Sequence, residues 1–240
     1  MLDHINLQNI LFLDIETVPQ YEEYKMLPGH LKLLWDHKAS FLTSNGASPE
    51  ELYDRAGIYA EFGKIVCIST GILTQTKDNH PHFRIKSFSG ENEKELLAGF
   101  IDLLNNHFNK SRYLLCAHNG KEFDFPFIAR RTIINELKLP RALTIAGKKP
   151  WEVPHLDTLE LWKFGDYKHY SSLNLLAAIF NIKAPKDDIS GKDVSKVFYK
   201  EKKLNRIVEY CQKDVLTVAQ IILKYKGENL IEENNITIVQ

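Results

Sequence analysis

The sequence lacks the features that mark disulfide-rich, membrane-spanning or secreted proteins. Its 240 residues contain only three cysteines and no Cys-x-x-Cys pair, which excludes a disulfide framework. No run approaches the roughly 18 consecutive apolar residues of a membrane span, and the N-terminus has neither the basic region nor the cleavage site of a secretion signal. Two cysteines lie in the apolar runs IVCIS and LLCAH. We therefore expect buried, reduced thiols in a cytoplasmic protein.

The sequence also lacks an excess of charge of either sign. It has 31 basic and 31 acidic residues, which by itself argues against a nucleic-acid partner. The distribution is less even, because residues 121–150 and 183–206 each carry four more basic than acidic residues, while residues 1–60 carry five more acidic than basic ones. Such basic segments either follow a phosphate backbone or form solvated faces, and charge alone leaves both interpretations open.

What is present is an alternation of short apolar runs with helical periodicity. The runs predict strands, and the periodic stretches predict helices. The predicted strands are Asn9–Ile15, Lys64–Leu73, His82–Ser89, Tyr113–Ala117 and a short strand or loop at His155–Leu159. The first predicted helix begins at about Glu91 and ends at Asn105. Three more predicted helices cover Asp124–Leu137, Ser171–Phe180 and Leu204–Tyr225. This order predicts an α/β or an α+β fold, with α/β favoured, built on one mixed β-sheet flanked by helices in one domain of residues 1–240.

Residues 20–60 form a long insertion between the first two predicted strands. Ser48-Pro49-Glu50-Glu51 is typical of a helix start, and Leu27, Leu31, Leu34 and Trp35 share a helical face that requires a partner. That partner is either the core of the protein or, for a mobile flap, a bound strand end. Pro185–Gly191 is expected to be a loop, and the end of the polar tail, residues 228–240, is expected to be loosely held.

Carboxylates occur at three positions that suggest a site. Asp14 and Glu16 follow the first apolar run and would point to the same side of a strand. Asp124 precedes Pro126 at a predicted helix start, where it is either functional or only a cap. Tyr210 and Asp214 share a helix face, next to its buried side. Paired carboxylates beside a core need compensation, which divalent Mg²⁺ or Mn²⁺ provides through oxygen ligands.

Together and in this order, the three motifs resemble the DEDD superfamily of 3′–5′ exonucleases. The family's first motif is D-x-E, its second Asp follows N-x₂₋₃-[FY], matched by Asn119 to Asp124, and its third motif is Y-x₃-D or H-x₄-D. Tyr210 satisfies the first form of the third motif, and position 209 is Glu, so the sequence is similar to the Tyr branch, which includes the proofreading exonuclease domains of family B DNA polymerases. The segment Pro185–Gly191 is similar to a standalone bacterial group. Polymerase domains usually have a shorter connection than residues 20–60.

This resemblance implies a ribonuclease-H-like fold and a metal-dependent exonuclease. Asp14, Glu16, Asp124 and Asp214 would bind two divalent cations, Mg²⁺ or Mn²⁺, and Tyr210 would orient and help deprotonate the attacking water. The implied contacts to the terminal nucleotide are Thr17, Asn119 and Phe123. Asp157 is a further carboxylate, for which a structural role is favoured over a catalytic one.

The expected substrate is the 3′ end of single-stranded nucleic acid, with DNA favoured over RNA. Two alternatives stay open: an exoribonuclease or oligonucleotide-degrading enzyme with the same chemistry, and a non-catalytic nucleic-acid-binding module. The second is disfavoured because no expected carboxylate is missing. Protein partners and the preferred metal do not follow from the sequence.

Overall fold

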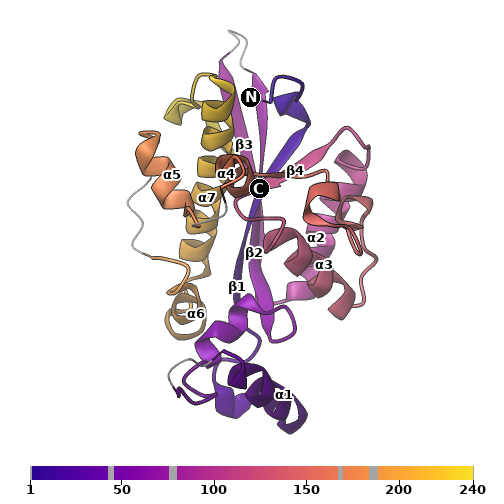
Figure 1. Ribbon diagram of the computed structural model, residues 1–240, viewed down its shortest axis with the longest axis vertical. Coiled ribbons are helices and arrows are strands. Elements are labelled where there is room, and N and C mark those ends of the chain that lie inside the picture. Colours follow the sequence, from indigo (N-terminus) through magenta and orange to yellow (C-terminus); the bar gives the residue numbers. More distant parts are fainter. Residues whose placement is uncertain (1, 43–45, 76–79, 167–169, 184–188, 240) are drawn as a thin grey trace.

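The computed structural model describes residues 2–42, 46–75, 80–166, 170–183 and 189–239. Its centre is a mixed sheet of six strands in the order β5-β4-β1-β2-β3-β6 (Figure 1). The strands are β1 (Ile10–Pro19), β2 (Gly63–Gln75), β3 (Pro81–Ser89), β4 (Leu114–Ala117), β5 (Leu156–Asp157) and β6 (Ile236–Val239). β2 is antiparallel to both β1 and β3, whereas β4 pairs in parallel with β1 and β5. The prediction of an α/β fold with a mixed sheet flanked by helices is confirmed.

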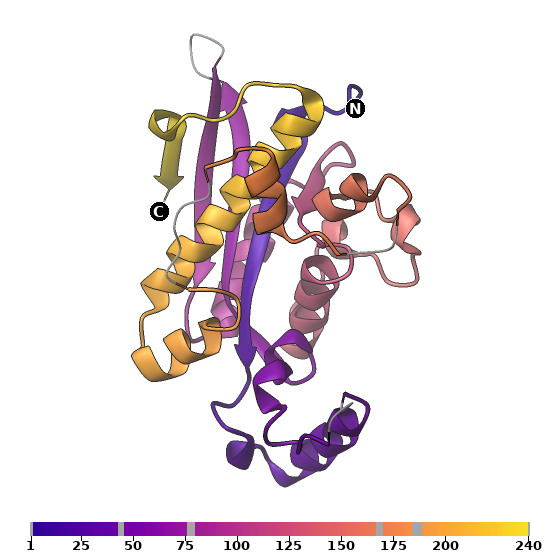
Figure 2. The same cartoon turned by 60° about the vertical axis from the view of Figure 1, so that its left-hand side comes forward.

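Helices cover both faces of the sheet (Figures 1 and 2). The helices are α1 (Gly29–Ser40), α2 (Glu93–His107), α3 (Asp124–Ile134), α4 (Thr158–Lys163), α5 (Leu173–Ile179), α6 (Val194–Lys196) and α7 (Leu204–Lys226). The shorter turns are η1 (Leu7–Asn9), η2 (Tyr24–Met26), η3 (Tyr53–Ile58), η4 (Arg141–Leu143), η5 (Pro150–Glu152), η7 (Glu233–Asn235) and the π-helical η6 (Val197–Glu201).

The two faces of β1 supply two separate cores because side chains alternate along a strand. Leu11, Leu13 and Ile15 pack with α2 and α3, while Ile10 and Phe12 pack with α7. Asp14 and Glu16 therefore belong to the α7 face. No helix in the described part of the chain is long and apolar enough to span a membrane. The three cysteines are buried and free, as expected.

The segment between β1 and β2 has a small core of its own. It lies beyond the end of β1, where Figure 1 shows α1 projecting away from the sheet. Trp35 is fully buried there, with its ring 5.6 Å from that of Tyr53 and 5.2 Å from that of Phe62. Its indole Nε1 donates a hydrogen bond to the Pro49 carbonyl at 2.8 Å. The predicted apolar face is thus largely internal to the segment, except for Leu34, which is 57% exposed.

Three local predictions need correction. The α-helix predicted from Ser48 is not formed. The amide of Ser48 donates a hydrogen bond to the Glu51 carboxylate and the amide of Glu51 donates one to the Ser48 hydroxyl, but only a turn and the short η3 follow. The tail was expected to be loosely held, but Ile236–Val239 form β6, which pairs in parallel with β3. β1 runs on to Pro19, so Asp14 and Glu16 lie inside the strand and not at its end. Of the loop predicted at 185–191, residues 185–188 lie outside the described part of the chain.

Candidate active site

Asp14 and Glu16 are held on one side of β1 by the strand's alternation. Opposite them on β2 stand Ser69 and Cys67, respectively, and the register shifts directly after Glu16. The shift marks a local irregularity of the kind that often lies near functional sites. Glu16 is only 7% exposed and Asp14 is partly buried. The strand therefore carries two carboxylates into the interface with α7.

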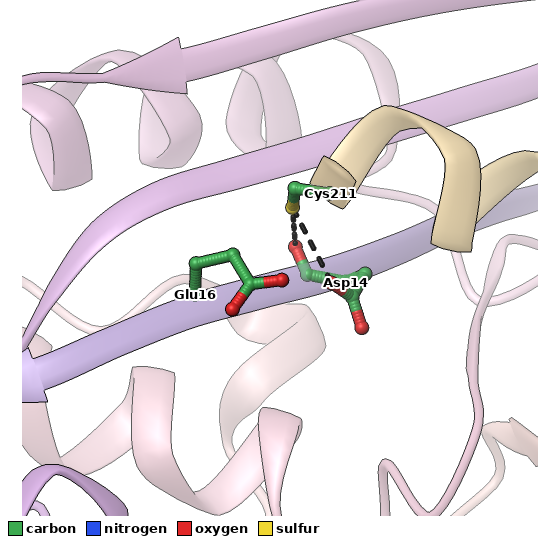
Figure 3. Close-up of side chains that lie close together, drawn as sticks. All are labelled: Asp14, Glu16 and Cys211. Atoms are coloured by element: carbon green, nitrogen blue, oxygen red, sulfur yellow. Dashed lines mark hydrogen bonds between the residues drawn. The ribbon is translucent and has the colours of Figure 1, made fainter. Parts of the chain in front are cut away.

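Helix α7 contributes three side chains to the same place. The single S–H of Cys211 is shared between the Oδ2 and the main-chain oxygen of Asp14, each 3.3 Å from the Sγ (Figure 3). Tyr210 forms a hydrogen bond with Asp214, one helical turn further on. Potential ligand atoms of Asp14, Glu16 and Cys211 all lie within 4.8 Å of one another. The α7 motif therefore packs directly against the β1 motif.

The turn between β4 and α3 places Asp124. Asn119 has a φ of 62°, in the left-handed region, which Asn tolerates better than most residues. A Cβ at Gly120 would lie 2.5 Å from that of Ala117, so only glycine fits. Asp124, the first residue of α3, is 3% exposed and accepts a hydrogen bond from the amide of Ile15, between the two β1 carboxylates.

Asp157 holds this turn in shape. Its Oδ1 accepts from the amide of Asn119 at 2.9 Å, and its Oδ2 accepts from the amide of Lys121 at 3.1 Å. The same Oδ1 also caps α4 by accepting from Leu159 and Glu160. These contacts agree with the structural role favoured from the sequence.

The carboxylates raise one another's pKa values. Burial raises the pKa of Asp14, and the nearby Glu16, Asp214 and Asp124 raise it further, against a hydrogen bond from Cys211. Burial, and then Asp214, raises the pKa of Glu16. Burial raises the pKa of Asp124 to about 8, with added repulsion from Asp157 and Asp214. None of the groups that dominate these shifts is a cation, so the cluster is an arrangement of like charges.

This donor set fits divalent cations. Asp14 and Glu16 offer carboxylate oxygens within 4.8 Å of each other, and Asp124 and Asp214 lie near enough to raise their pKa values. Hard cations such as Mg²⁺ and Mn²⁺ prefer oxygen ligands. Bringing such carboxylates together without a counter-charge destabilises the fold, and a bound cation would remove that cost. Asp14, Glu16, Asp124 and Asp214 are the residues that could hold it.

A cavity of about 800 Å³ adjoins Glu16, one of the four carboxylates. Glu16, Thr17 and Phe123 line it, so one carboxylate and two of the three predicted nucleotide contacts meet there. Asn119 is not among the lining residues; its main chain is engaged with Asp157 instead. The cavity extends from Glu16 to the segment that joins β1 and β2.

Sequence reasoning overlooked Cys211. The residue sits inside the third motif, and its place among the apolar residues of α7 could have indicated a thiol facing β1. Conversely, Arg131, in a segment considered for phosphate binding, is buried and hydrogen-bonded to Glu93 at 2.9 Å. Its guanidinium cannot contact a nucleic-acid strand, because it is hydrogen-bonded to Glu93 and to the Ala60 carbonyl inside the protein.

Comparison with known proteins identifies a family match. Residues 58–232 match the model of a family described as a predicted 3′–5′ exonuclease related to the exonuclease domain of PolB. The matched range contains Asp124, Tyr210 and Asp214, and it leaves out β1 and most of the segment that follows it. A search of curated proteins finds no match.

Similar solved structures are much longer than this chain. The family B DNA polymerase of Pyrobaculum calidifontis matches with a TM-score of 0.49 and 15% identity, over 90% of this chain and 24% of the polymerase. Exonuclease I of E. coli, solved with a dT13 oligonucleotide, matches with a TM-score of 0.40 and 11% identity, over 82% of this chain and 42% of that one. The chain thus spans less than half the length of either protein.

Proposed function

Because the chain belongs to the family of predicted 3′–5′ exonucleases related to the exonuclease domain of PolB, we propose that it removes nucleotides from the 3′ ends of single-stranded DNA with two divalent cations. The observation that carries this proposal is the convergence of Asp14, Glu16, Asp124 and Asp214, whose mutual repulsion calls for cations. A binding module would have no need to retain so costly a group of charges.

The reaction is hydrolysis of the last phosphodiester. A water oxygen attacks phosphorus, the bond from phosphorus to the 3′ oxygen breaks, and that oxygen receives a proton. The products are a nucleoside 5′-monophosphate and a strand with a new 3′ hydroxyl. When bound, two divalent cations stabilise the charge on both the attacking and the leaving oxygens. The four carboxylates would hold them.

Tyr210 orients the attacking water. Burial raises the pKa of its phenol, and the charges of Asp214, Glu16 and Asp14 raise it further. The hydroxyl therefore keeps its proton at neutral pH and acts by hydrogen bonding. This favours the orienting part of the role expected from the sequence over the deprotonating part.

The predicted substrate contacts then take different roles. Thr17 and Phe123 face the cavity beside Glu16, so they contact the terminal nucleotide. The Phe123 ring packs on that of Phe127 at 5.4 Å, which fixes a surface for base stacking that does not depend on sequence. Asn119 acts through the shape of the turn that positions Asp124.

An end-labelling assay tests the proposal. Single-stranded DNA oligomers labelled at the 3′ or the 5′ end are incubated with the protein and Mg²⁺ or Mn²⁺, with an EDTA control. We expect immediate release of the 3′ label as a mononucleotide and stepwise shortening of the 5′-labelled strand. Matched RNA oligomers, expected to be degraded more slowly, test the nucleic-acid preference. Early release of the 5′ label, or no cleavage with either cation, would refute the activity.

A further inference from the structure

The cavity beside Glu16 has two walls from distant parts of the chain. One wall belongs to the segment between β1 and β2 and includes Arg55 and Ile58 from η3. The second wall includes Lys192 from the turn before α6, Lys196 from α6 and Tyr199 from η6. The family match begins only at residue 58, so most of the first wall lies outside it.

Direct contacts tie the two walls together. The Tyr199 hydroxyl donates to the Pro19 carbonyl at 2.6 Å. The Lys200 Nζ lies 2.6 Å from a carboxylate oxygen of Glu22 and 3.1 Å from one of Glu23. These bonds join η6 to the start of the segment, directly after β1.

The segment is also anchored at its far end. A Cβ at Gly57 would lie only 3.1 Å from the Val18 carbonyl carbon, so η3 packs closely on the β1 main chain. The buried Arg131 donates to the Ala60 carbonyl at 2.9 Å. The described residues of this segment, 20–42 and 46–62, are thus held against β1 and η6, which favours a wall of the cavity over a loose flap.

The basic side chains that line the cavity differ in whether they form ion pairs with acidic residues. The Lys200 charge is engaged by Glu22 and Glu23, as described above. Arg55, Lys192 and Lys196 are all exposed and line the same cavity. Besides Glu16 and Glu22, the acidic residue in the lining is Asp54. Apart from the carboxylates of the candidate cation site, the cavity therefore has a surplus of cations, contributed by both walls.

We propose that this cavity holds the last nucleotides of the single strand, with Arg55 on one wall and Lys192 and Lys196 on the other binding its phosphates. This inference rests on the proposed function, which supplies the strand. A cavity of about 800 Å³ is in the range of pockets that enclose a small ligand, so it admits a short stretch of single strand but not a double helix. Ile58, half exposed, and the ring of Tyr199 offer apolar surfaces to the bases.

Binding measurements at several salt concentrations test the proposal. The probe is a fluorescent dT12 strand and the protein is an Asp14→Asn background, which prevents cleavage. Each phosphate contact contributes about 0.7 to the slope of log affinity against log salt for single strands. We expect Arg55→Ala to reduce the slope by about 0.7 and Lys192→Ala with Lys196→Ala by about 1.4, with affinity at low salt falling roughly 10-fold for the pair.

Lys148→Ala with Lys149→Ala is the matched control. Lys148 lines a different cavity and Lys149 lies over the ring of Trp151, so this pair should leave the slope unchanged. In the otherwise unmodified protein, the Lys192/Lys196 pair should raise KM for a dT12 substrate and spare a dinucleotide. If the slope of log affinity against log salt is the same for the Arg55 and Lys192/Lys196 variants as for the control, the single strand does not bind in this cavity. That result would not contradict the proposed nuclease activity. Absence of cleavage by the unmodified chain would instead refute the proposed function, and the binding slopes would still decide the strand path.

Discussion

Two buried glutamates in this protein have opposite surroundings. Glu16 and Glu93 are 7% and 6% exposed, respectively. Both carboxylate oxygens of Glu93 accept hydrogen bonds. Arg131 donates to both oxygens, the amide of Ile65 donates at 2.7 Å, and the side-chain amide of Asn135 donates at 2.9 Å. Glu16 faces Asp14, Asp124 and Asp214 instead. The fold therefore satisfies a buried carboxylate where it is structural and leaves one with like charges where we propose that it binds cations.

The difference also separates stability from function. The Glu93–Arg131 pair joins α2 to α3, and Arg131 adds bonds to Ala60 in the segment that follows β1. The carboxylate cluster joins β1, α3 and α7 but opposes their assembly electrostatically. The first group should therefore act mainly on unfolding, and the second mainly on turnover.

Removal of Asp14 should have the largest effect. Asp14→Asn and Asp14→Ala should lower cleavage on the order of 10³-fold or more, because the charge that holds the cations is lost. Both variants should be at least as stable as the parent without metal. Single-turnover cleavage and thermal melting measure this. Glu122→Gln, at an exposed carboxylate in the same turn as Asp124, is the control and should cleave normally. Wild-type turnover in Asp14→Asn would contradict the assignment.

Loss of Arg131 should have the reverse signature. Arg131→Met leaves Glu93 buried without its cation, which should lower the free energy of unfolding by about 3–5 kcal/mol. Urea denaturation measures the loss. Lys183→Met is the matched control, since the Lys183–Glu233 pair is exposed to solvent and its loss should change the free energy of unfolding little. Similar small losses for both variants would show that the buried pair is not a principal stabiliser.

Tyr210→Phe should reduce turnover roughly 10²-fold with little change in the cation concentration needed for half-maximal activity. Only the hydroxyl is removed, so the ring still packs at the end of the cluster. Cleavage rates across a Mn²⁺ titration distinguish the two effects. A shift in the Mn²⁺ midpoint at unchanged maximal rate would assign Tyr210 to the cation site instead of to the water.

The smallest expected effect is a pH dependence of stability. The folded pKa of Asp124 is raised to about 8 from an ordinary value of 3.8, so its contribution is present below about pH 4 and lost as the pH rises towards 8. Without metal, Asp124→Asn should match the parent in stability near pH 4 and exceed it at pH 8. Saturating Mn²⁺ should reverse that order at pH 8. Denaturation curves at both pH values, with EDTA or Mn²⁺, measure it; an advantage of the variant that grows as the pH falls would contradict the sign.

Much of the fold could be predicted because its elements are locally encoded. The apolar runs of β1, β2 and β4 and the periodicity of α2 and α7 each contain enough residues to distinguish strand from helix. β6 was missed because a four-residue strand in a polar tail has no pattern of its own and is formed by pairing with β3. The helix predicted from Ser48 failed because the same capping contacts serve a single turn.

The candidate site divides in the same way. Asp14 and Glu16 are two residues apart, and Tyr210 and Asp214 are four apart, so strand and helix geometry alone indicate that each pair shares a side. That Cys211 hydrogen-bonds to Asp14 depends on the packing of α7 on β1, which joins residues 197 positions apart. No local pattern carries such a contact.

By itself, the sequence determined the type and order of the main strands and helices and which carboxylates share one side of an element, because these follow from short-range periodicity. Only the tertiary structure decided which charges are available. It buried Arg131 against Glu93, engaged Lys200 with Glu22 and Glu23, and left Arg55, Lys192 and Lys196 facing the cavity. The residue type sets the charge of a side chain. The electrostatic free energy of that charge depends on the solvent and the partners around it, and these are fixed only when distant segments pack together.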